Sequence, residues 1–137
     1  MIDIDGAMGE GGGQVLRTSL TLSAVTGEPV RVRNIRANRP KPGLMRQHLT
    51  AVRATASICN GEITGDVIGS GEITFRPKSI QAGEYCFSVG TAGSANLVMQ
   101  TVLPALMTVA GESRVTVEGG THNPAAPPYE FLAESYL

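Results

Sequence analysis

The stretch GQVLRTSLTLSAVTGEPVRVR, residues 13–33, indicates the fold of this chain. Apolar residues recur at helical spacing over residues 13–26, which predicts a helix closed by Gly27. Residues 30–33 then alternate apolar and basic side chains, which predicts a strand with both arginines on one face. Residues 1–5 also alternate, with apolar and acidic side chains, which predicts a short strand. The chain therefore begins as strand, helix, strand.

The elements expected downstream continue this order. Residues 38–43 contain two prolines and a glycine, which predicts a loop. An apolar residue then recurs every three or four positions from residue 45 to residue 59, which predicts a helix ended by an Asn-Gly pair. Its apolar side chains are Met45, Leu49, Val52, Ala56 and Cys59. Residues 63–67 and 72–76 indicate a pair of strands joined by a glycine turn.

The same order starts again near residue 84. Residues 85–89 predict a strand, residues 95–109 an apolar helix and residues 114–117 another strand. The two halves also match in sequence, with Gly27-Glu28 repeated as Gly111-Glu112 and the Val-x-Val of the second strand repeated one residue later. A duplication explains both observations. We predict an α+β (α/β) fold of repeated β-α-β-α-β-β units, the first over 1–83 and an incomplete second over 84–137.

The end of the chain predicts that it is a fragment of a larger domain. A helix expected from about residue 128 stops without a capping glycine or a basic last turn, and the second unit lacks its closing pair of strands. A truncated unit leaves an unpaired sheet edge and an uncovered apolar face, so self-association is also expected.

Positive charge is concentrated in one part of the chain. Its net charge is −1, yet seven of its eleven Lys and Arg residues lie within residues 29–61, which contain no Asp or Glu. Such placement predicts a local surface that binds an anion, phosphate above all. The seven are Arg31, Arg33, Arg36, Arg39, Lys41, Arg46 and Arg53.

Two of these arginines are the strongest candidates for phosphate binding. Arg36 and Arg39 flank a loop, and the planar guanidinium pairs well with a phosphate. Gln47 and His48 follow in the first turns of the next helix, where the helix dipole favours an anion. Arg31, Arg33 and Arg53 are expected to be solvated surface charges.

A glycine-rich turn, residues 9–13, precedes the first helix. It fits neither the dinucleotide fingerprint nor the Walker pattern, and glycine content alone also fits a flexible turn. Its backbone N–H groups can nevertheless approach phosphate oxygens closely. Glu10 within it is a candidate ligand for Mg²⁺ or Mn²⁺, and Arg17, two helical turns later, is within reach of the same anion.

Composition excludes several classes of function. Aromatic residues make up 4% of the chain, which argues against stacking of single-stranded bases. The two cysteines show neither metal-site nor disulfide spacing and are expected to be buried thiols. Neither a signal peptide nor a membrane-spanning stretch is apparent, so we expect a soluble protein of the cytoplasm. No nucleophile triad or paired carboxylates are evident, and the residues alone leave the reaction open.

Two further polar residues need an interpretation. Gln100 interrupts the apolar helix, where its amide either satisfies a neighbouring backbone group or reads a base or ribose. Pro104 is expected to kink that helix. His122 has no second histidine or cysteine at metal spacing and is expected at the surface.

Several motifs run in order along the whole chain and together resemble one family. They are GEGGGQVLR (9–17), IRANRPKPGL (35–44), RQHLT (46–50), GS (93–94), QTVLP (100–104), GGT (119–121), NP (123–124) and APP (126–128). In this combination they resemble the RNA 3′-terminal phosphate cyclase family.

The resemblance implies a fold and a reaction. The fold is built from units with two helices packed on one face of a four-stranded sheet. The reaction is that of an ATP-dependent ligase acting in RNA processing, which converts an RNA 3′-terminal phosphate to a 2′,3′-cyclic phosphodiester with help from a divalent metal. A histidine takes AMP from ATP, AMP passes to the 3′-phosphate, and the vicinal 2′-hydroxyl expels it.

The resemblance also implies roles for individual residues. Glu10 would hold the metal or the ATP phosphates, Gln100 would contact ATP, and Pro127 would pack against adenine. The implied phosphate contacts are Arg17, Arg36, Arg39, Gln47 and His48. The AMP-accepting histidine is expected beyond residue 137, so this chain should contain no catalytic nucleophile and be inactive alone.

Three alternatives remain open at the level of sequence. A non-catalytic relative with this fold would serve as a scaffold in ribosome assembly. An enolpyruvyl-transferase-like enzyme would also bind phosphate with arginines but would need no ATP. A plain nucleic-acid-binding module would use residues 29–61 and would bind RNA irrespective of its end.

Overall fold

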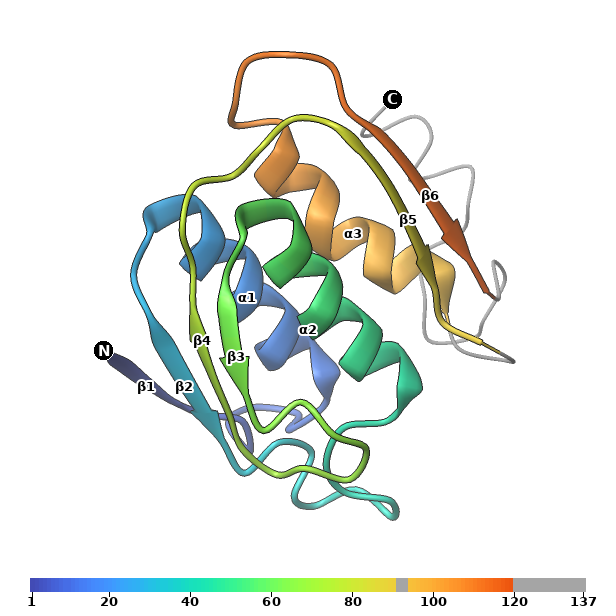
Figure 1. Ribbon diagram of the computed structural model, residues 1–137. Coiled ribbons are helices and arrows are strands. Elements are labelled where there is room, and N and C mark those ends of the chain that lie inside the picture. Colours follow the sequence, from blue (N-terminus) through green and yellow to red (C-terminus); the bar gives the residue numbers. More distant parts are fainter. Residues whose placement is uncertain (91–93, 120–137) are drawn as a thin grey trace.

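A mixed four-stranded sheet forms one side of the molecule (Figure 1). The computed structural model describes residues 1–90 and 94–119. The strands are β1 (Ile2–Asp5), β2 (Val30–Arg33), β3 (Glu62–Thr64) and β4 (Ile73–Arg76), in the order β1-β2-β4-β3. β1 and β2 are parallel, while β4 is antiparallel to both of its neighbours.

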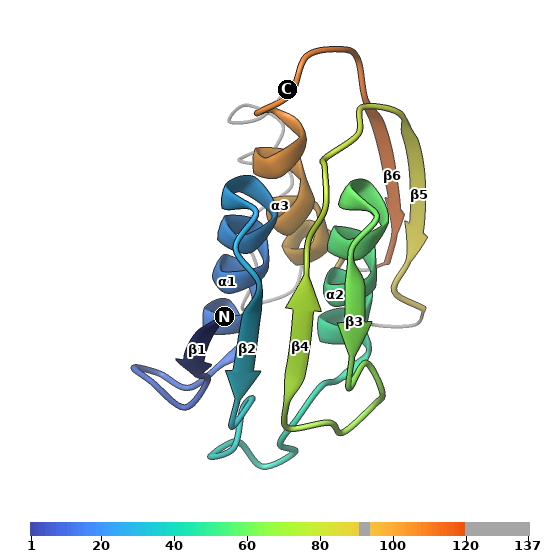
Figure 2. The ribbon, with the colours of Figure 1, turned by 60° about the vertical axis from the view of Figure 1, so that its left-hand side comes forward.

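Two helices cover one face of this sheet (Figure 2). They are α1 (Gly13–Thr26) and α2 (Arg46–Cys59). Val30 and Val32 of β2 are buried on the helix side, and so are Ile73 and Phe75 of β4. The alternating residues point to the opposite, solvated face, as a half-buried strand requires. The predicted α+β fold, with two helices on one face of a four-stranded sheet, is confirmed.

A second, two-stranded sheet follows in the chain. β5 (Glu84–Ser88) and β6 (Arg114–Glu118) are parallel and are connected through α3 (Ala95–Leu106), as β1 and β2 are through α1. α3 packs against both α1 and α2, so these two helices lie between the four-stranded sheet and α3. The division into duplicated units over 1–83 and 84–137 stays a prediction.

Most predicted boundaries agree with the structure, and two do not. α1 ends at Gly27, whose φ of 79° is the left-handed conformation that glycine adopts readily. α3 ends at Leu106 and not at residue 109, because the N–H groups of Thr108 and Val109 bond three residues back in tighter turns. β3 ends at Thr64, so the predicted strand 63–67 was also too long.

The burial of two residues was wrongly predicted. Met45 is 41% exposed at the start of α2, so the apolar stripe of this helix begins at Leu49. Cys59 is buried, but Cys86 is exposed. The alternation of β5 explains this, since Tyr85 and Phe87 pack on the core and the residue between them points outward. No helix among the described residues has both the length and the apolar character needed to cross a membrane.

Candidate functional site

A cleft of about 820 Å³ opens where β1 leads into α1. Its walls are the glycine turn 9–13, the start of α1, part of the loop between β2 and α2, and the first turn of α2. Six of the side chains predicted as site residues line it: Glu10, Arg17, Arg36, Arg39, Gln47 and His48. The structure therefore brings together residues from three separate stretches of sequence.

The glycine turn has the backbone conformation that its composition indicates. Gly9 and Gly11 have φ of 63° and 65°, where a side chain would be strained. Asp5 anchors the start of the turn, since its Oδ1 accepts hydrogen bonds from the Ala7 N–H and the Asn34 side chain. Gly12, the N-cap of α1, has no side chain to cap the helix, so the positive end of the helix dipole borders the cleft.

Arg17 is a cation without a carboxylate partner among the described residues. Its side chain is buried at 9% exposure, and its Nε has no hydrogen-bond partner there. Nη2 donates to Oε1 of Gln14 at 3.2 Å, a neutral acceptor. Burial lowers the pKa of Arg17, yet a guanidinium stays charged at neutral pH. A buried charge with no counter-charge is unfavourable, so this side of the cleft favours an anionic ligand.

His48 is buried and neutral. Its Nδ1 accepts a hydrogen bond from the backbone N–H of Met45 at 3.1 Å, so its ring proton lies on Nε2. Burial, and then the charges of Arg36 and Arg17, lower its pKa to about 4. A neutral imidazole in this tautomer is a hydrogen-bond donor, and Nε2 is therefore suited to a phosphate oxygen.

Gly13 lets His48 and Arg17 approach the start of α1. A Cβ at this position would lie 2.6 Å from His48 Nε2 and 2.7 Å from Arg17 Nη1. At Gly12, a Cβ would lie 2.8 Å from Arg39 Nη2. The exposed Arg39 side chain could move aside at Gly12, whereas the buried His48 ring could not do so easily at Gly13, so close packing constrains Gly13 above all, which the sequence pattern did not reveal.

Arg36 and Arg39 organise the second wall of the cleft. Arg36 has a φ of 50° and donates through Nη1 to the carbonyl oxygens of Lys41 at 2.6 Å and Gly43 at 2.9 Å. Burial and the charge of Arg39 lower its pKa. Arg39 donates to the Glu10 carbonyl oxygen at 3.0 Å and so connects its loop to the glycine turn. These arginines shape the cleft as well as supplying its charge.

Gln47 connects the cleft to α3. Its Oε1 accepts the Ser94 N–H at 3.0 Å, and the Ser94 side chain in turn caps the start of α3 at Leu97. Gln100 does not line the main cleft. It lines a smaller pocket of about 200 Å³ between α1 and α3, which shares Arg17 with the cleft. Pro127 lies outside the described residues.

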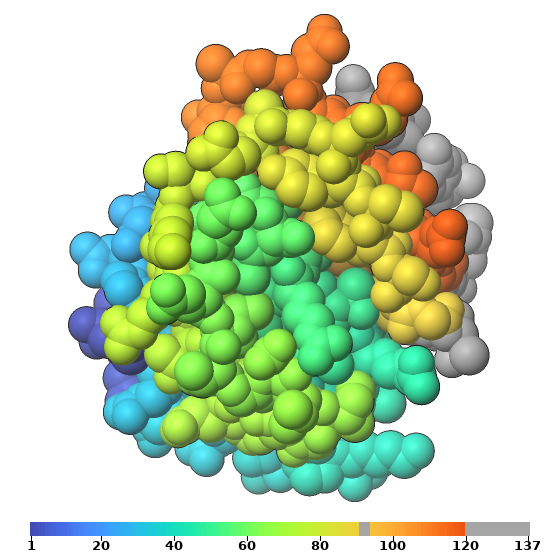
Figure 3. Space-filling model, in the orientation of Figure 1, coloured from blue at the N-terminus to red at the C-terminus, as the bar shows by residue number. Residues whose placement is uncertain are grey.

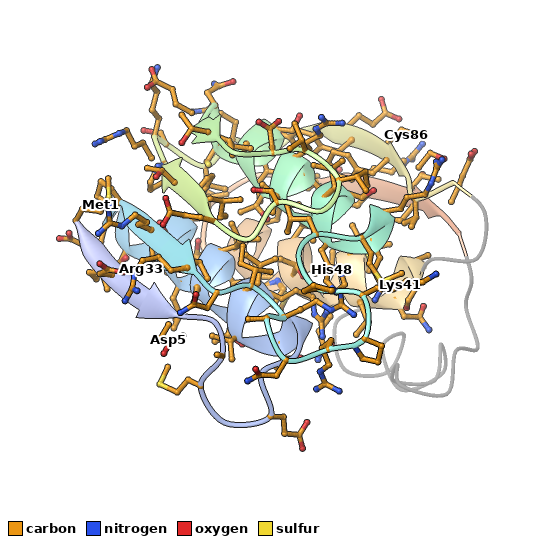
Figure 4. All side chains as sticks on the ribbon, turned by 90° about the horizontal axis from the view of Figure 1, so that it is seen from below. Met1, Asp5, Arg33, Lys41, His48 and Cys86 are labelled. Carbon is orange, nitrogen blue, oxygen red and sulfur yellow. The ribbon has the colours of Figure 1, made fainter. Side chains whose placement is uncertain are left out.

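The three arginines expected to be surface charges are all paired with carboxylates. Arg31 and Arg33 each bond to Asp3 at 2.7 Å on the outer face of the sheet. The Nε of Arg53 lies 3.3 Å from a carboxylate oxygen of Asp66. All three side chains are exposed, as expected of solvated surface charges, and Figure 4 shows Arg33 on the sheet, away from His48.

Glu10 is the sole carboxylate among the described residues that line the cleft. Within the same residues no group of three or more His, Cys, Asp or Glu side chains is arranged to hold a metal ion. One exposed carboxylate still fits Mg²⁺, which keeps several waters and commonly binds through one or two carboxylates together with substrate phosphates.

Comparison with known proteins identifies the family of this chain. Residues 8–137 match the family model described as RNA 3′-terminal phosphate cyclase. The chain belongs to this family. It is 59% identical over 136 residues to the RNA 3′-terminal phosphate cyclase of Koribacter versatilis (strain Ellin345), a match that covers 99% of this chain. The same match covers 38% of the relative, so the chain spans well under half of the relative's length.

Proposed function

We propose that the full-length protein is an ATP-dependent RNA 3′-terminal-phosphate cyclase, a ligase of RNA processing, and that this chain supplies its phosphate-binding part. The buried, uncompensated charge of Arg17 carries the proposal. In a phosphate complex that charge would gain a counter-charge, and the burial of the Arg17 side chain would strengthen the interaction.

The terminal phosphate would be held from several sides. Arg17 and Arg39 supply positive charge, and neutral His48 donates through Nε2. These groups neutralise the phosphate, so that a nucleophile can approach it and negative charge on its oxygens is stabilised in the transition state. They also orient it, which reduces the entropic part of the barrier.

The proposed reaction has three steps. A histidine beyond residue 137 attacks the α-phosphorus of ATP and expels pyrophosphate. The 3′-phosphate then takes AMP from that histidine, and finally the vicinal 2′-hydroxyl attacks the activated phosphorus, closes the ring and expels AMP. Because the nucleophile would lie outside this chain, we propose that residues 1–137 alone are inactive.

Two cofactor contacts belong to the same proposal. Glu10 would hold Mg²⁺ or Mn²⁺, which neutralises phosphate charge when bound. Gln100 would contact ATP from the small pocket beside Arg17, with Pro127 against the adenine. We propose that the protein acts in the cytoplasm and that it forms a homo-oligomer.

The experiment is to incubate the full-length protein with α-labelled ATP, a divalent metal, and RNA ending in either a 3′-phosphate or a 3′-hydroxyl. Labelled protein, and a cyclic end formed from the 3′-phosphate RNA alone, is the expected result. Absence of both labelled protein and cyclic product would contradict the proposal and favour a non-catalytic scaffold. The presence of the phosphate-contacting residues in the cleft argues against the scaffold, and family membership argues against the enolpyruvyl-transferase alternative.

A further inference from the structure

A second groove, of about 480 Å³, lies between the outer face of α2 and β5. In Figure 3 the surfaces of these two elements meet, α2 in green and β5 in yellow. The polar side chains of its wall come mainly from one face of α2. They are Arg46, Thr50, Arg53 and Ser57, with Ser88 opposite. The proposed function makes no use of this groove.

The charge of the groove favours an anionic polymer. No Asp or Glu is among its lining residues, and Arg46 has no ion pair within the described part of the chain. Arg53 is held in place by Asp66, through Nε to a carboxylate oxygen and through Nη2 to the backbone oxygen at 3.0 Å. Its side chain remains 58% exposed, so it can still meet a ligand.

The strand side of the groove offers hydrogen-bonding groups. Within the described residues β5 pairs with β6 alone, so its other edge has unpaired backbone N–H and C=O groups. Cys86 and Ser88 of this strand line the groove. Donors and acceptors of this kind suit ribose hydroxyls and base edges, whereas an apolar ligand would leave them unsatisfied.

The groove begins next to the phosphate cleft. Arg46 lines the groove, and its neighbours Met45 and Gln47 line the cleft. Arg53 lies seven residues further on, about 10 Å along the helix axis. A strand whose end occupies the cleft would therefore meet Arg46 first and Arg53 next. Lys41, just before α2, adds an exposed cation at the end of the molecule where Figure 4 shows His48.

We propose that this groove binds the nucleotides that precede the 3′-terminal phosphate of a single-stranded RNA. The inference rests on the proposed function and adds to it a path for the RNA body. Arg46 and Arg53 would contact backbone phosphates, and the edge of β5 would contact sugars and bases. A peptide strand could also pair with that edge, but it would not require the two arginines.

The test compares Arg46→Glu with Arg76→Glu in the full-length protein. Arg76 is an exposed arginine on β4, outside both the cleft and the groove, so its variant makes the same change in net charge. Each protein is assayed on a nucleoside 3′-monophosphate, which has no internucleotide phosphate, and on a 3′-phosphorylated dodecamer. Arg46→Glu should raise KM about tenfold on the dodecamer and leave the mononucleotide unchanged, while Arg76→Glu changes neither.

Cross-linking without ATP gives a second readout. RNA with thiouridine a few nucleotides before its 3′-phosphate should cross-link to peptides that contain Arg46–Cys59 or Glu84–Ser88. Equal KM changes on both substrates would contradict the proposal that this groove binds RNA. Cross-links confined to other peptides would contradict it as well. If the wild-type protein cyclised neither substrate, the proposed function would fail, whereas loss of the length dependence alone would overturn this inference and leave that function intact.

Discussion

Arg31 and Arg33 of the sheet come from the same basic stretch of sequence as Arg36 and Arg39 of the cleft, yet their surroundings differ. Arg31 and Arg33 share Asp3 on the open face of the sheet, where water also solvates them. Arg36 and Arg39 bond to backbone carbonyl oxygens around the cleft. Buried Arg17, from α1, bonds to an amide oxygen.

The difference shows which cations lack a counter-charge. Arg31 and Arg33 share one carboxylate on the open face of the sheet, where water and salt screen them, so a further anion gains little there. A buried guanidinium that contacts dipoles alone keeps its full charge in a medium of low dielectric, so an anion is bound strongly there. Charge density along the sequence does not reveal this difference, because Arg17 lies outside the basic stretch 29–61, and burial and counter-charge distinguish the cations.

The largest expected effect tests the uncompensated cation. Arg17→Met keeps the shape of the side chain and removes its charge, so kcat/KM for the 3′-phosphate RNA should fall about a thousandfold. The melting temperature should not fall, because no carboxylate among the described residues loses its partner. Activity and thermal unfolding of the full-length protein measure the two effects.

Arg33→Met is the matched control for this variant. It removes a cation that is paired at the surface, so activity should stay within about twofold of wild type. Equal losses of activity in the two variants would show that total positive charge, and not its pairing, governs phosphate binding.

The second effect tests the packing of the cleft. Gly13→Ala places a methyl group against His48 and Arg17, and displacement of these groups should lower activity about a hundredfold. Gly71→Ala is the control, since a Cβ at Gly71 meets nothing within 4 Å and activity should stay within about twofold. A fully active Gly13→Ala enzyme would mean that neither side chain needs its position.

The third effect is a pH dependence caused by His48. Its pKa is about 4 in the folded protein and 6.5 when unperturbed, so between these values the unfolded chain binds a proton that the folded protein does not. The free energy of unfolding is therefore highest above the unperturbed pKa. It falls as the pH drops, by about 3 kcal/mol when the pH reaches the folded-state pKa.

His48→Gln isolates this contribution. The free energies of unfolding of wild type and variant are measured at about pH 7 and about pH 4, and the wild type should lose about 3 kcal/mol more over this interval. Parallel losses in both proteins would assign the pH dependence to other groups and would contradict a buried neutral histidine.

The smallest expected effect concerns the paired arginines of the sheet. Asp3→Asn leaves Arg31 and Arg33 without their carboxylate, as the cleft arginines are, but at an exposed position. Water solvates them there, so RNA cyclisation and its salt dependence should stay within about twofold of wild type. A markedly tighter binding of RNA would show that pairing alone, without burial, separates the two groups of arginines.

Local patterns predicted most of the architecture. The limits of α1 at Gly13 and Thr26 agree with the sequence, because its closing glycine acts within a few residues of the helix. The predicted end of α3 did not agree with the structure, because an apolar sequence continues past Leu106 while the backbone changes to tighter turns. The exposed Cys86 was missed because the face of β5 that packs inward depends on its contact with α2, which lies far away in the sequence.

Much of the candidate cleft was also predicted, although its internal contacts were not. The resemblance to the family and the basic stretch pointed to Arg36, Arg39 and His48, which do line one cleft. Neither indicated that Gly13 packs against His48, nor that Gln47 bonds to Ser94, since these contacts join residues far apart in the chain.

By itself the sequence determined the order of strands and helices, the family, and the supply of glycines and cations near α1 and α2, because spacing and composition act locally. Only the tertiary structure decided which arginines are neutralised. Asp3 lies 30 residues from Arg33, and Arg17 becomes buried where α1, α2 and α3 pack together. Ion pairing and desolvation depend on distance in space and on exclusion of water, which the order of residues alone does not specify.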